Sequence, residues 1–332
     1  MLTLYFMHNT YVGRFAPSPS GQLHFGSLVT AVASYLDAKH HGGKWLLRME
    51  DIDEPRCIAG IDKDILVTLE AHGLHWDDAV IYQSQQHTRY QAVLDALINE
   101  GRAYRCTCTR KQIKAMGGVY DGRCRDKSSA TLLAIDEENS AIRLKLDTQL
   151  EAFNDVIMGV VEPQPVHVQN GSHHALTNPA IYGSQQAEDV VLKRRDGLFS
   201  YNLVVILDDV FQHVNHVIRG CDLIDVTPLQ RAVYQALGYD APEYGHIPVA
   251  AVAPGRKLSK QNRAAPVDNK TPIENIVRVM NFLGFSFPNA AAFDDVNTVL
   301  TEAISLWNRK KVVKTPEIIV PQHESTYYNE PL

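Results

Sequence analysis

The chain has 332 residues, of which 45% are hydrophobic and 21% are charged. This composition predicts a soluble globular protein with an ample core, built as one large domain with insertions or as two domains. The formal net charge of −6 counts against a protein that follows long stretches of nucleic acid, since such proteins often carry a basic surface. It still allows a short local contact. No apolar run reaches the length of a transmembrane helix.

Neither a targeting signal nor a disulfide framework is indicated. The first ten residues are apolar, but they lack the basic start and the small-residue cleavage site of a signal peptide. The five cysteines are an odd number in a chain of ordinary composition, which does not suggest paired disulfides. We therefore expect a protein of the reducing cytoplasm without membrane contact. A monomer is also expected.

The N-terminal part has the pattern of a βαβ unit. Residues 11–15 are predicted to form a strand, which leads into a turn rich in Pro, Ser and Gly over residues 16–21. Apolar residues at helical spacing predict a helix over residues 26–40, and residues 44–49 are expected to form the next strand. This order indicates an α/β fold with a parallel sheet.

The elements expected further along the chain interrupt and then resume this pattern. Helices are predicted over residues 62–72 and 87–100, and residues 106–186 are interpreted as an irregular insertion between two halves of the sheet. Apolar runs then predict strands, and the last part of the chain is expected to be helical. The later elements are strands over residues 203–207 and 214–218, a helix over residues 227–237, and helices after residue 262.

A phosphate site is predicted where the first strand turns into the first helix. The segment 14–27 reads Arg-Phe-Ala-Pro-Ser-Pro-Ser-Gly-Gln-Leu-His-Phe-Gly-Ser. A helix N-terminus presents free N–H groups and partial positive charge, which suit a phosphate. His24 can donate a hydrogen bond to a phosphate oxygen, and Gly26 allows close approach to the backbone. Taken alone, such a segment is more often a plain turn.

A second candidate segment contains two lysines around a serine. Residues 255–262 read Gly-Arg-Lys-Leu-Ser-Lys-Gln-Asn, with Lys257 and Lys260 flanking the Leu-Ser pair. A lysine-rich loop is usually a solvated surface. Together with His24-Phe-Gly-Ser27, however, this loop resembles the paired nucleotide motifs of class I aminoacyl-tRNA synthetases. Ser27, Leu258 and Gln261 depart from the consensus residues of those motifs.

The resemblance implies a Rossmann-type catalytic domain that uses ATP with Mg²⁺ to form an adenylate. A carboxylate attacks the α-phosphate and pyrophosphate leaves, so catalysis consists of positioning and electrostatic stabilisation. No general base is needed, because a carboxylate is already ionised at neutral pH. The predicted catalytic residues are His24, Lys257 and Lys260. The predicted ATP-binding residues are His24, Gly26, Ser27 and Lys260.

Further segments narrow the resemblance to the glutamyl and glutaminyl branch of the class. They are residues 13–21, the acidic segment 47–53 (Leu-Arg-Met-Glu-Asp-Ile-Asp), residues 196–203 and residues 217–223. Glutamate offers two carboxylates, which arginine binds well, and one ammonium group, which a carboxylate binds. The predicted glutamate-binding residues are Arg14, Ala16, Ser18, Glu50, Tyr201 and Arg219. A surface ion pair is the commoner role for any one of these charged residues.

The cysteines suggest a metal site within the insertion. Cys106, Cys108 and Cys124 lie within 19 residues of one another, and three thiols so close together in a cytosolic protein suggest zinc. Spacing leaves the fourth ligand open between Tyr120, a nearby aspartate (Asp121 or Asp126) and a distant residue. The segment also resembles a short zinc insertion of glutamyl-type enzymes, which implies that Tyr120 completes a structural site with one Zn²⁺ per chain.

We divide the chain into four segments on these grounds. They are residues 1–105 as the first half of the nucleotide-binding catalytic domain, 106–190 as the zinc-containing, acceptor-binding-like insertion, 191–263 as the second half with the lysine loop, and 264–332 as a short helical region. The stretch 166–188, rich in His, Asn, Gln and Ser, is interpreted as a loop without an assigned role.

The short C-terminal region resembles that of the glutamyl-queuosine tRNA(Asp) synthetases. These truncated paralogues lack the helical anticodon-binding domain of full glutamyl-tRNA synthetases. The resemblance implies that glutamate is activated without tRNA and then transferred to the queuosine base in the anticodon loop of tRNA(Asp). A small RNA footprint also fits the acidic net charge.

The sequence leaves three alternatives open. The nearest is a truncated but conventional glutamyl-tRNA synthetase that charges the 3′ end of tRNA(Glu). Another is a nucleotidylyltransferase of the same fold with a different acid as substrate. The third is an inactive zinc-containing RNA-binding protein, against which the presence of His24, Lys257 and Lys260 speaks.

Overall fold

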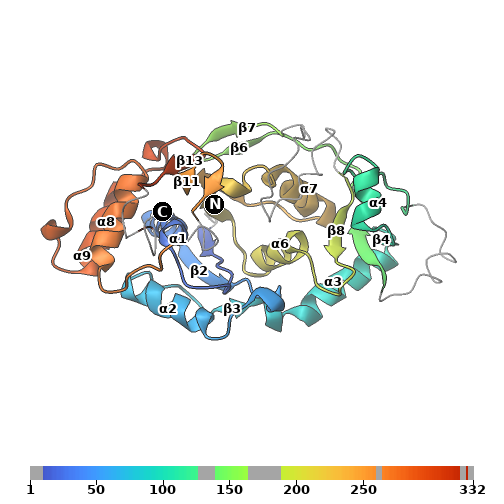
Figure 1. Ribbon diagram of the computed structural model, residues 1–332, viewed down its shortest axis with the longest axis horizontal. Coiled ribbons are helices and arrows are strands. Elements are labelled where there is room, and N and C mark those ends of the chain that lie inside the picture. Colours follow the sequence, from blue (N-terminus) through green and yellow to red (C-terminus); the bar gives the residue numbers. More distant parts are fainter. Residues whose placement is uncertain (1–9, 126–138, 164–187, 259–263, 322–326, 328–332) are drawn as a thin grey trace, which may run out of the picture.

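The computed structural model describes residues 10–125, 139–163, 188–258, 264–321 and 327 (Figure 1). Its helices and strands in these residues are β1 (Val12–Phe15), α1 (Phe25–His40), β2 (Lys44–Met49), η1 (Glu54–Arg56), α2 (Ile61–Ala71), β3 (Ile81–Tyr82), η2 (Gln83–Gln85), α3 (His87–Asn99), β4 (Ala103–Cys106), α4 (Arg110–Ala115), β5 (Ala141–Leu144), β6 (Phe153–Asp155), β7 (Gly159–Val161), β8 (Val190–Lys193), α6 (Tyr201–Phe211), β9 (His216–Gly220), η5 (Cys221–Leu223), α7 (Thr227–Leu237), β10 (Glu243–Ile247), β11 (Val249–Ala253), β12 (Arg256–Lys257), α8 (Pro272–Phe282), η7 (Ala290–Ala292), α9 (Val296–Leu306), η8 (Arg309–Lys311) and β13 (Glu317–Ile319).

Parallel strands form the centre of the molecule. β1 pairs with β2 and β2 with β3, while β9 pairs with β10, and every one of these pairs is parallel. Asn215 joins the two groups. Its side-chain oxygen accepts from the Val12 backbone amide at 2.8 Å, and its backbone amide donates to the Val12 carbonyl at 3.0 Å. The chain therefore leaves β1 toward β2 and β3 on one side and returns as β9 and β10 on the other. Such a switch point opens a crevice at the carboxyl ends of the strands.

The first βαβ unit forms as its sequence predicts. α1 begins after His24, whose side chain accepts from the Ser27 amide at 3.3 Å. The chain reverses after the helix at Gly42, which has a φ of 64°. A Cβ on the next residue, Gly43, would lie 2.4 Å from the Tyr11 carbonyl oxygen, so only glycine allows β2 to start beside β1.

The predicted strand over residues 203–207 is wrong, since these residues lie in helix α6. The run Leu-Val-Val-Ile-Leu is buried at every position, and a short run that is apolar on all sides does not distinguish a core strand from a core helix. The strand predicted over residues 214–218 lies two residues later, as β9, and the helix over residues 227–237 is α7.

The insertion contains regular structure in the part of it that is described. β5 pairs antiparallel with β4 and with β8, and β6 and β7 form a separate antiparallel hairpin. Figure 1 shows β4 and α4 at one end of the elongated molecule and α8 and α9 at the other. Most of residues 166–188 lie outside the described residues. The division of the chain into four segments stays a prediction.

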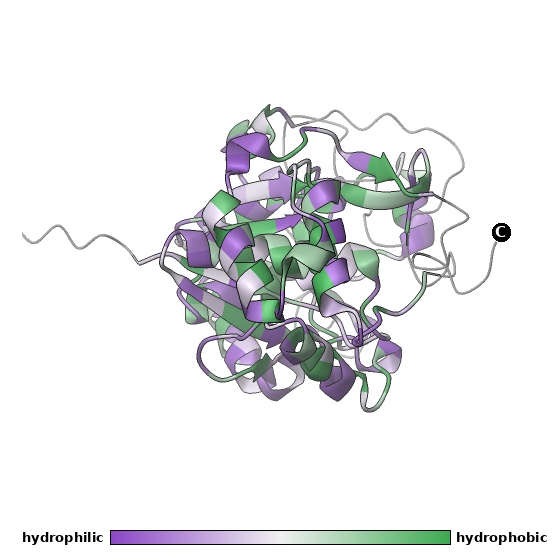
Figure 2. Ribbon diagram, turned by 90° about the vertical axis from the view of Figure 1, so that its left-hand side faces the viewer, coloured by the Kyte–Doolittle hydropathy of each residue, from purple (hydrophilic) through white to green (hydrophobic). Residues whose placement is uncertain are grey.

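The C-terminal region is helical as expected, with α8 and α9, but it also contributes β13, which pairs parallel with β11. Figure 2, in which this end of the molecule faces the viewer, shows hydrophilic and hydrophobic residues interleaved along its helices, as amphipathic helices require. Their apolar faces join the core cluster that also contains α1 and β2. No helix among the described residues is long and apolar enough to cross a membrane.

Asp37 of α1 fixes the C-terminal region to the sheet. It is fully buried and accepts hydrogen bonds from the Tyr11 hydroxyl at 2.5 Å, the Trp307 indole at 2.8 Å and the Arg309 guanidinium at 2.8 Å. Burial opposes ionisation of Asp37, but Arg309 and the other donors outweigh it and lower the pKa of the carboxyl group. The carboxylate is therefore charged, and both of its oxygen atoms accept hydrogen bonds.

We predict that Asp37→Asn lowers the free energy of unfolding by about 3–5 kcal/mol, because the variant leaves the Arg309 guanidinium without its buried counter-ion. Since the fold lowers the pKa of Asp37, the stabilisation is present above the carboxyl pKa of the unfolded chain and is lost as the pH falls through the folded-state value. Urea unfolding from pH 3 to pH 7 measures both effects. Asp78→Asn, which removes the exposed pair with Lys44, is the control and should leave the midpoint unchanged.

Candidate active site and metal centre

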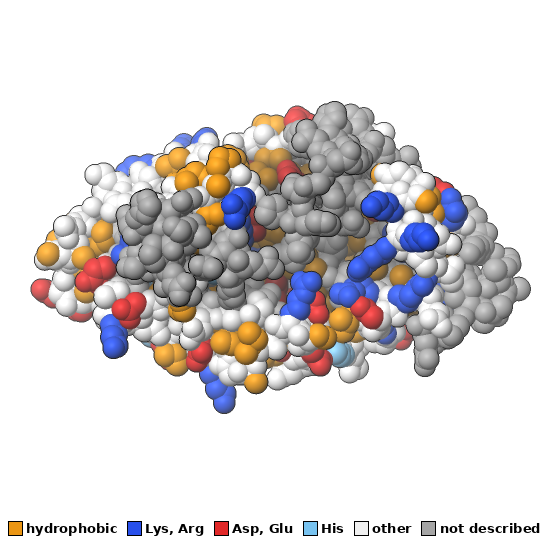
Figure 3. All heavy atoms as spheres, viewed as in Figure 1, with side chains coloured by type: hydrophobic (Ala, Val, Ile, Leu, Met, Phe, Trp, Pro, Cys, Tyr) orange, Lys and Arg blue, Asp and Glu red, His pale blue; other side chains and the backbone are white. Residues whose placement is uncertain are grey.

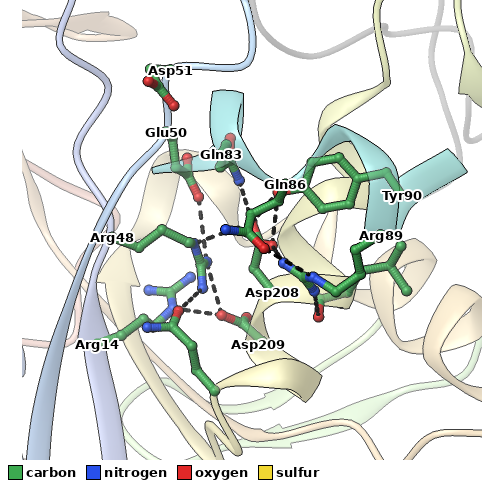
Figure 4. A network of polar contacts seen from close by, with 12 residues as sticks. Arg14, Arg48, Glu50, Asp51, Gln83, Gln86, Arg89, Tyr90, Asp208 and Asp209 are labelled. Carbon is green, nitrogen blue, oxygen red and sulfur yellow. Dashed lines mark hydrogen bonds and ion pairs between the residues drawn. The ribbon is translucent and has the colours of Figure 1, made fainter. Parts of the chain in front are cut away.

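A group of buried charges lies at the carboxyl ends of the central strands. Arg14 comes from β1, Arg48 from β2 and Asp209 from α6, and all three side chains are almost fully buried (Figure 4). The Arg48 guanidinium lies 2.9 Å from the Asp209 carboxylate, and the Arg14 Nε lies 3.4 Å from it. Burial opposes ionisation of Asp209, but Arg48 and Arg14 lower its pKa. Asp209 therefore serves as the counter-ion for two arginines.

The neighbouring Asp208 completes the support of Arg48. Its carboxylate lies 3.6 Å from the Arg48 Nε and 2.5 Å from the Arg89 guanidinium. It also accepts from the Tyr90 hydroxyl at 2.8 Å and from the Gln83 amide at 2.7 Å. Figure 4 shows these side chains converging from α3 and η2 onto α6. Asp208 thus ties α6 to the helix that precedes the insertion.

Glu50 and Tyr201 face the same group of charges. Glu50 follows β2, and its carboxylate lies 3.5 Å from the Arg48 guanidinium. Burial raises the pKa of Glu50 and outweighs the opposing effect of Arg48 and Arg14. Tyr201 is the first residue of α6 and is 37% exposed. Burial of its hydroxyl, with a further contribution from Glu50, raises its pKa to about 12, so Tyr201 is a neutral hydrogen-bonding group at physiological pH.

Arg219 differs from Arg14 in its partners. It lies near the end of β9, is buried, and donates hydrogen bonds to four neutral acceptors: His246 at 3.0 Å, Thr227 at 2.8 Å, Gln230 at 2.7 Å and the Leu223 carbonyl at 3.3 Å. Among the described residues, no carboxylate lies within 4.0 Å of its guanidinium. Arg219 is close enough to influence the pKa of Tyr201, as are Arg14 and Glu50. The structure thus brings these four predicted residues into one electrostatic neighbourhood.

The predicted phosphate site lies at the start of α1. The His24 ring contacts both the amide and the hydroxyl of Ser27 at 3.3 Å. A Cβ on Gly26 would lie 3.2 Å from this ring, so a larger residue would press on His24. Ala16 is half-buried and Ser18 is exposed in the turn after β1. The Pro17 carbonyl of this turn accepts from the Glu50 amide at 2.9 Å, which holds the turn beside the acidic segment.

The lysine segment is only partly described. Lys257 lies in β12 and pairs with Asp222 at 2.6 Å, three residues after Arg219. This contact places the start of the segment at the end of β9. Lys260 lies outside the described residues, as do Ser259 and Gln261. The roles of Lys257 and Lys260 therefore stay predictions.

The three cysteines of the insertion lie together at the end of the molecule formed by β4 and α4. The sulfur atoms of Cys106, Cys108 and Cys124 are all within 4.8 Å of one another, and those of Cys108 and Cys124 are 3.7 Å apart. A tetrahedral ion with Zn–S bonds of about 2.3 Å requires sulfur atoms about 3.8 Å apart. The cluster therefore has the donor type and the spacing to hold such an ion.

Tyr120 is the one candidate for a fourth ligand that lies within this cluster in the described residues. Its hydroxyl accepts from the Cys124 amide at 3.0 Å and contacts the Tyr104 hydroxyl at 3.3 Å. The Arg143 guanidinium lies over the Tyr120 ring at 3.9 Å from its centre. By contrast, Asp121 pairs with Arg123 on the surface, and Asp126 lies outside the described residues.

Residues 11–293 match the family described as tRNA synthetases class I (E and Q), catalytic domain. The protein named glutamyl-Q tRNA(Asp) synthetase in Shewanella oneidensis is 46% identical over 93% of this chain and 95% of its own length. The protein of the same name in Photobacterium profundum is 44% identical over 93% of this chain and 92% of its own. The chain belongs to the class I glutamyl and glutaminyl tRNA synthetase family. It is therefore an enzyme of the ligase type.

A solved structure agrees with this assignment. The glutamate-tRNA synthetase of Elizabethkingia anophelis superposes with a TM-score of 0.68 at 25% identity, over 92% of this chain and 67% of that protein. The expected class I fold with a parallel sheet is thereby confirmed. The nearly complete coverage of the glutamyl-Q relatives distinguishes them from this longer synthetase.

Sequence reasoning missed several residues of this synthetase site. Arg48 lies inside the acidic segment used for the resemblance, and an arginine within an otherwise apolar strand was the available signal. Asp208 and Asp209 follow an apolar run that was interpreted as a strand, which concealed their position on the inner face of a helix. Asp155 and His246, which Arg219 contacts through a chain of hydrogen bonds, had no motif to mark them.

We predict that the purified synthetase retains about one thiophilic divalent ion per chain and that Cys124→Ser loses it, because a tetrahedral thiolate site tolerates no missing ligand. Metal analysis after gel filtration measures the content. Cys57→Ser is the matched control, since Cys57 lies outside the cluster. Retention of a full equivalent by Cys124→Ser, or loss from both variants, would contradict the assignment.

Proposed function

We propose that this synthetase activates glutamate with ATP, without needing tRNA, and transfers the glutamyl group to the queuosine base in the anticodon of tRNA(Asp). The observation that carries the proposal is the electrostatic neighbourhood of Arg14, Glu50, Tyr201 and Arg219, in which both arginines are buried, within a chain that matches the glutamyl-Q relatives over more than nine-tenths of their length. We propose that it works in the cytoplasm; its monomeric state stays a prediction.

The charges of the pocket complement those of glutamate. The substrate carries two carboxylates and one ammonium group at neutral pH. Arg14 and Arg219 offer two guanidinium groups, and Glu50 offers a carboxylate for the ammonium group. Tyr201 adds a neutral hydroxyl. Ala16 and Ser18 belong to the turn beside them and are proposed to contact the substrate through this turn.

The start of α1 is the proposed ATP site. His24, Gly26 and Ser27 lie at the helix N-terminus, where free amides and the helix dipole favour phosphate. The glutamate carboxylate attacks the α-phosphate, and pyrophosphate leaves with Mg²⁺. His24 and the helix amides stabilise charge on the phosphate oxygens, and Lys257 and Lys260 are proposed to add positive charge to the same oxygens. Lys257 must exchange Asp222 for a phosphate oxygen to do so.

The proposed ion at Cys106, Cys108, Tyr120 and Cys124 is a structural Zn²⁺. Four protein ligands leave no open position for chemistry. The cluster lies at the end of the molecule that also carries β4 and α4, away from β2 at its centre. Its role is to hold the small insertion together, since few apolar residues surround it.

The proposed RNA contact lies at the same end. Figure 3 shows Lys and Arg side chains gathered on this part of the surface, in a chain whose net charge is −6. Exposed residues of this region include Arg110, Lys111 and Lys114 of α4 and Arg195 after β8. A local basic patch on an acidic protein suits a short stretch of RNA backbone, such as one anticodon loop.

We predict that glutamate-dependent ATP–pyrophosphate exchange proceeds without tRNA, and that labelled glutamate is transferred to tRNA(Asp) that carries queuosine. Transfer to tRNA(Asp) lacking queuosine, or preference for tRNA(Glu), would contradict the proposed acceptor and favour a conventional glutamyl-tRNA synthetase. Exchange with another acid but not with glutamate would favour a nucleotidylyltransferase with a different substrate. Absence of any exchange would favour an RNA-binding protein without activity.

We also predict that Lys260→Ala lowers the rate of glutamate-dependent exchange by about 100-fold or more, because the transition state loses a cation that stabilises the phosphate oxygens. Steady-state exchange rates measure the effect. Lys270→Ala, at an exposed position outside the proposed site, is the control and should keep the normal rate. A near-normal rate for Lys260→Ala would remove Lys260 from the mechanism.

A further inference from the structure

A buried chain of hydrogen bonds connects the β6–β7 hairpin to Arg219. The Asp155 carboxylate, at the end of β6, lies 2.6 Å from His246 Nδ1. On the other side of the same ring, His246 Nε2 accepts from the Arg219 Nε at 3.0 Å. His246 and Arg219 are direct partners in the register of β10 and β9. All three side chains are at most 4% exposed.

The protonation of this chain follows from its surroundings. Burial, helped by the positive charge of Arg219, outweighs the opposing effect of Asp155 and lowers the pKa of His246 to about 4, so the imidazole is neutral at physiological pH. Asp155 is held as an acceptor, because its carboxylate also receives the amides of Ile157 at 3.0 Å and Met158 at 2.7 Å. The network therefore assigns the proton to Nδ1, and Nε2 is left as an acceptor.

In this tautomer, His246 accepts a hydrogen bond from Arg219 but does not compensate its positive charge. A neutral acceptor fixes the plane of the guanidinium but does not neutralise it. Thr227 and Gln230, which accept from another nitrogen of the same group, are also neutral. Arg14, by comparison, shares the carboxylate of Asp209. Arg219 is thus oriented by four hydrogen bonds and keeps its charge for an incoming carboxylate.

We infer that Asp155 and His246 are positioning residues for glutamate binding, which act by holding Arg219 in a fixed orientation toward a carboxylate of the substrate. The inference rests on the proposed function, since it takes glutamate as the ligand of Arg219. It assigns a role to the β6–β7 hairpin, whose end supplies the carboxylate that selects the tautomer. A protonated His246 or the other tautomer would present an N–H to Arg219, donor against donor.

Two substitutions of His246 test its contact with Asp155 and its contact with Arg219 separately. The side-chain amide of Asn can take the place of Nδ1 and keep the contact with Asp155, but it does not reach Arg219. The longer Gln side chain can place its amide oxygen near the position of Nε2 and keep the acceptor for Arg219. In Asp155→Asn, the amide can donate toward His246 and favour the tautomer that turns an N–H toward Arg219.

The test measures glutamate-dependent ATP–pyrophosphate exchange with separate titrations of glutamate and ATP. We expect His246→Asn and Asp155→Asn to raise the KM for glutamate at least about tenfold, the scale of one lost charge-assisted hydrogen bond, with the KM for ATP within about twofold and kcat within about threefold of the wild type. His246→Gln should lie closer to the wild type than His246→Asn. His72→Asn, at a buried histidine that contacts Thr68 and Asn275, should leave both KM values unchanged.

A folded His246→Asn or Asp155→Asn protein with wild-type KM for glutamate would overturn the inference, and so would an equal rise in the KM for ATP. Thermal unfolding establishes whether each variant is folded. If His246→Asn does not fold, the KM of Asp155→Asn for glutamate decides whether the inference holds. A wild-type protein without glutamate-dependent exchange would instead overturn the proposed function, and this inference with it.

Discussion

The ion pairs of Arg48 with Asp208 and Asp209 are the interaction on which the arrangement of the site depends. Arg48 is fully buried in β2, and burying a charge without a partner costs several kcal/mol. Two consecutive aspartates on the inner face of α6 supply the compensation. The fold must therefore bring α6 against the end of β2, and this contact also places Tyr201, at the start of the helix, over the carboxyl ends of the strands.

Arg14 and Arg219 differ in how far the protein compensates their positive charge. Arg14 shares Asp209 with Arg48, so its charge is partly compensated within the protein. Among the described residues, Arg219 donates hydrogen bonds only to neutral acceptors. One compensated and one uncompensated cation near Glu50 together complement the charges of the proposed substrate, which is both anionic and cationic. Asn215 places β9 beside β1, and this contact brings the two arginines into the same neighbourhood.

The parts of the site that lie near one another in the sequence could be predicted from it. The strand, turn and helix around Arg14 and His24 follow from local signals, since turn residues and helical spacing are properties of a short segment. The acidic segment with Glu50 and the cysteine cluster were also visible as motifs. The helix at residues 203–207 could not be predicted, because full burial removes the periodicity that distinguishes a helix from a strand. Asp155 and His246 are 91 residues apart and meet only through tertiary structure, so no spacing could connect them.

The central claim is that Arg219 and Glu50 bind opposite charges of one glutamate molecule, and a crystal structure of the protein with bound glutamate tests it most directly. The account predicts a substrate carboxylate within hydrogen-bond distance of the Arg219 guanidinium and the substrate ammonium group facing Glu50. Glutamate bound elsewhere, or bound with its ammonium group toward Arg219, would contradict it.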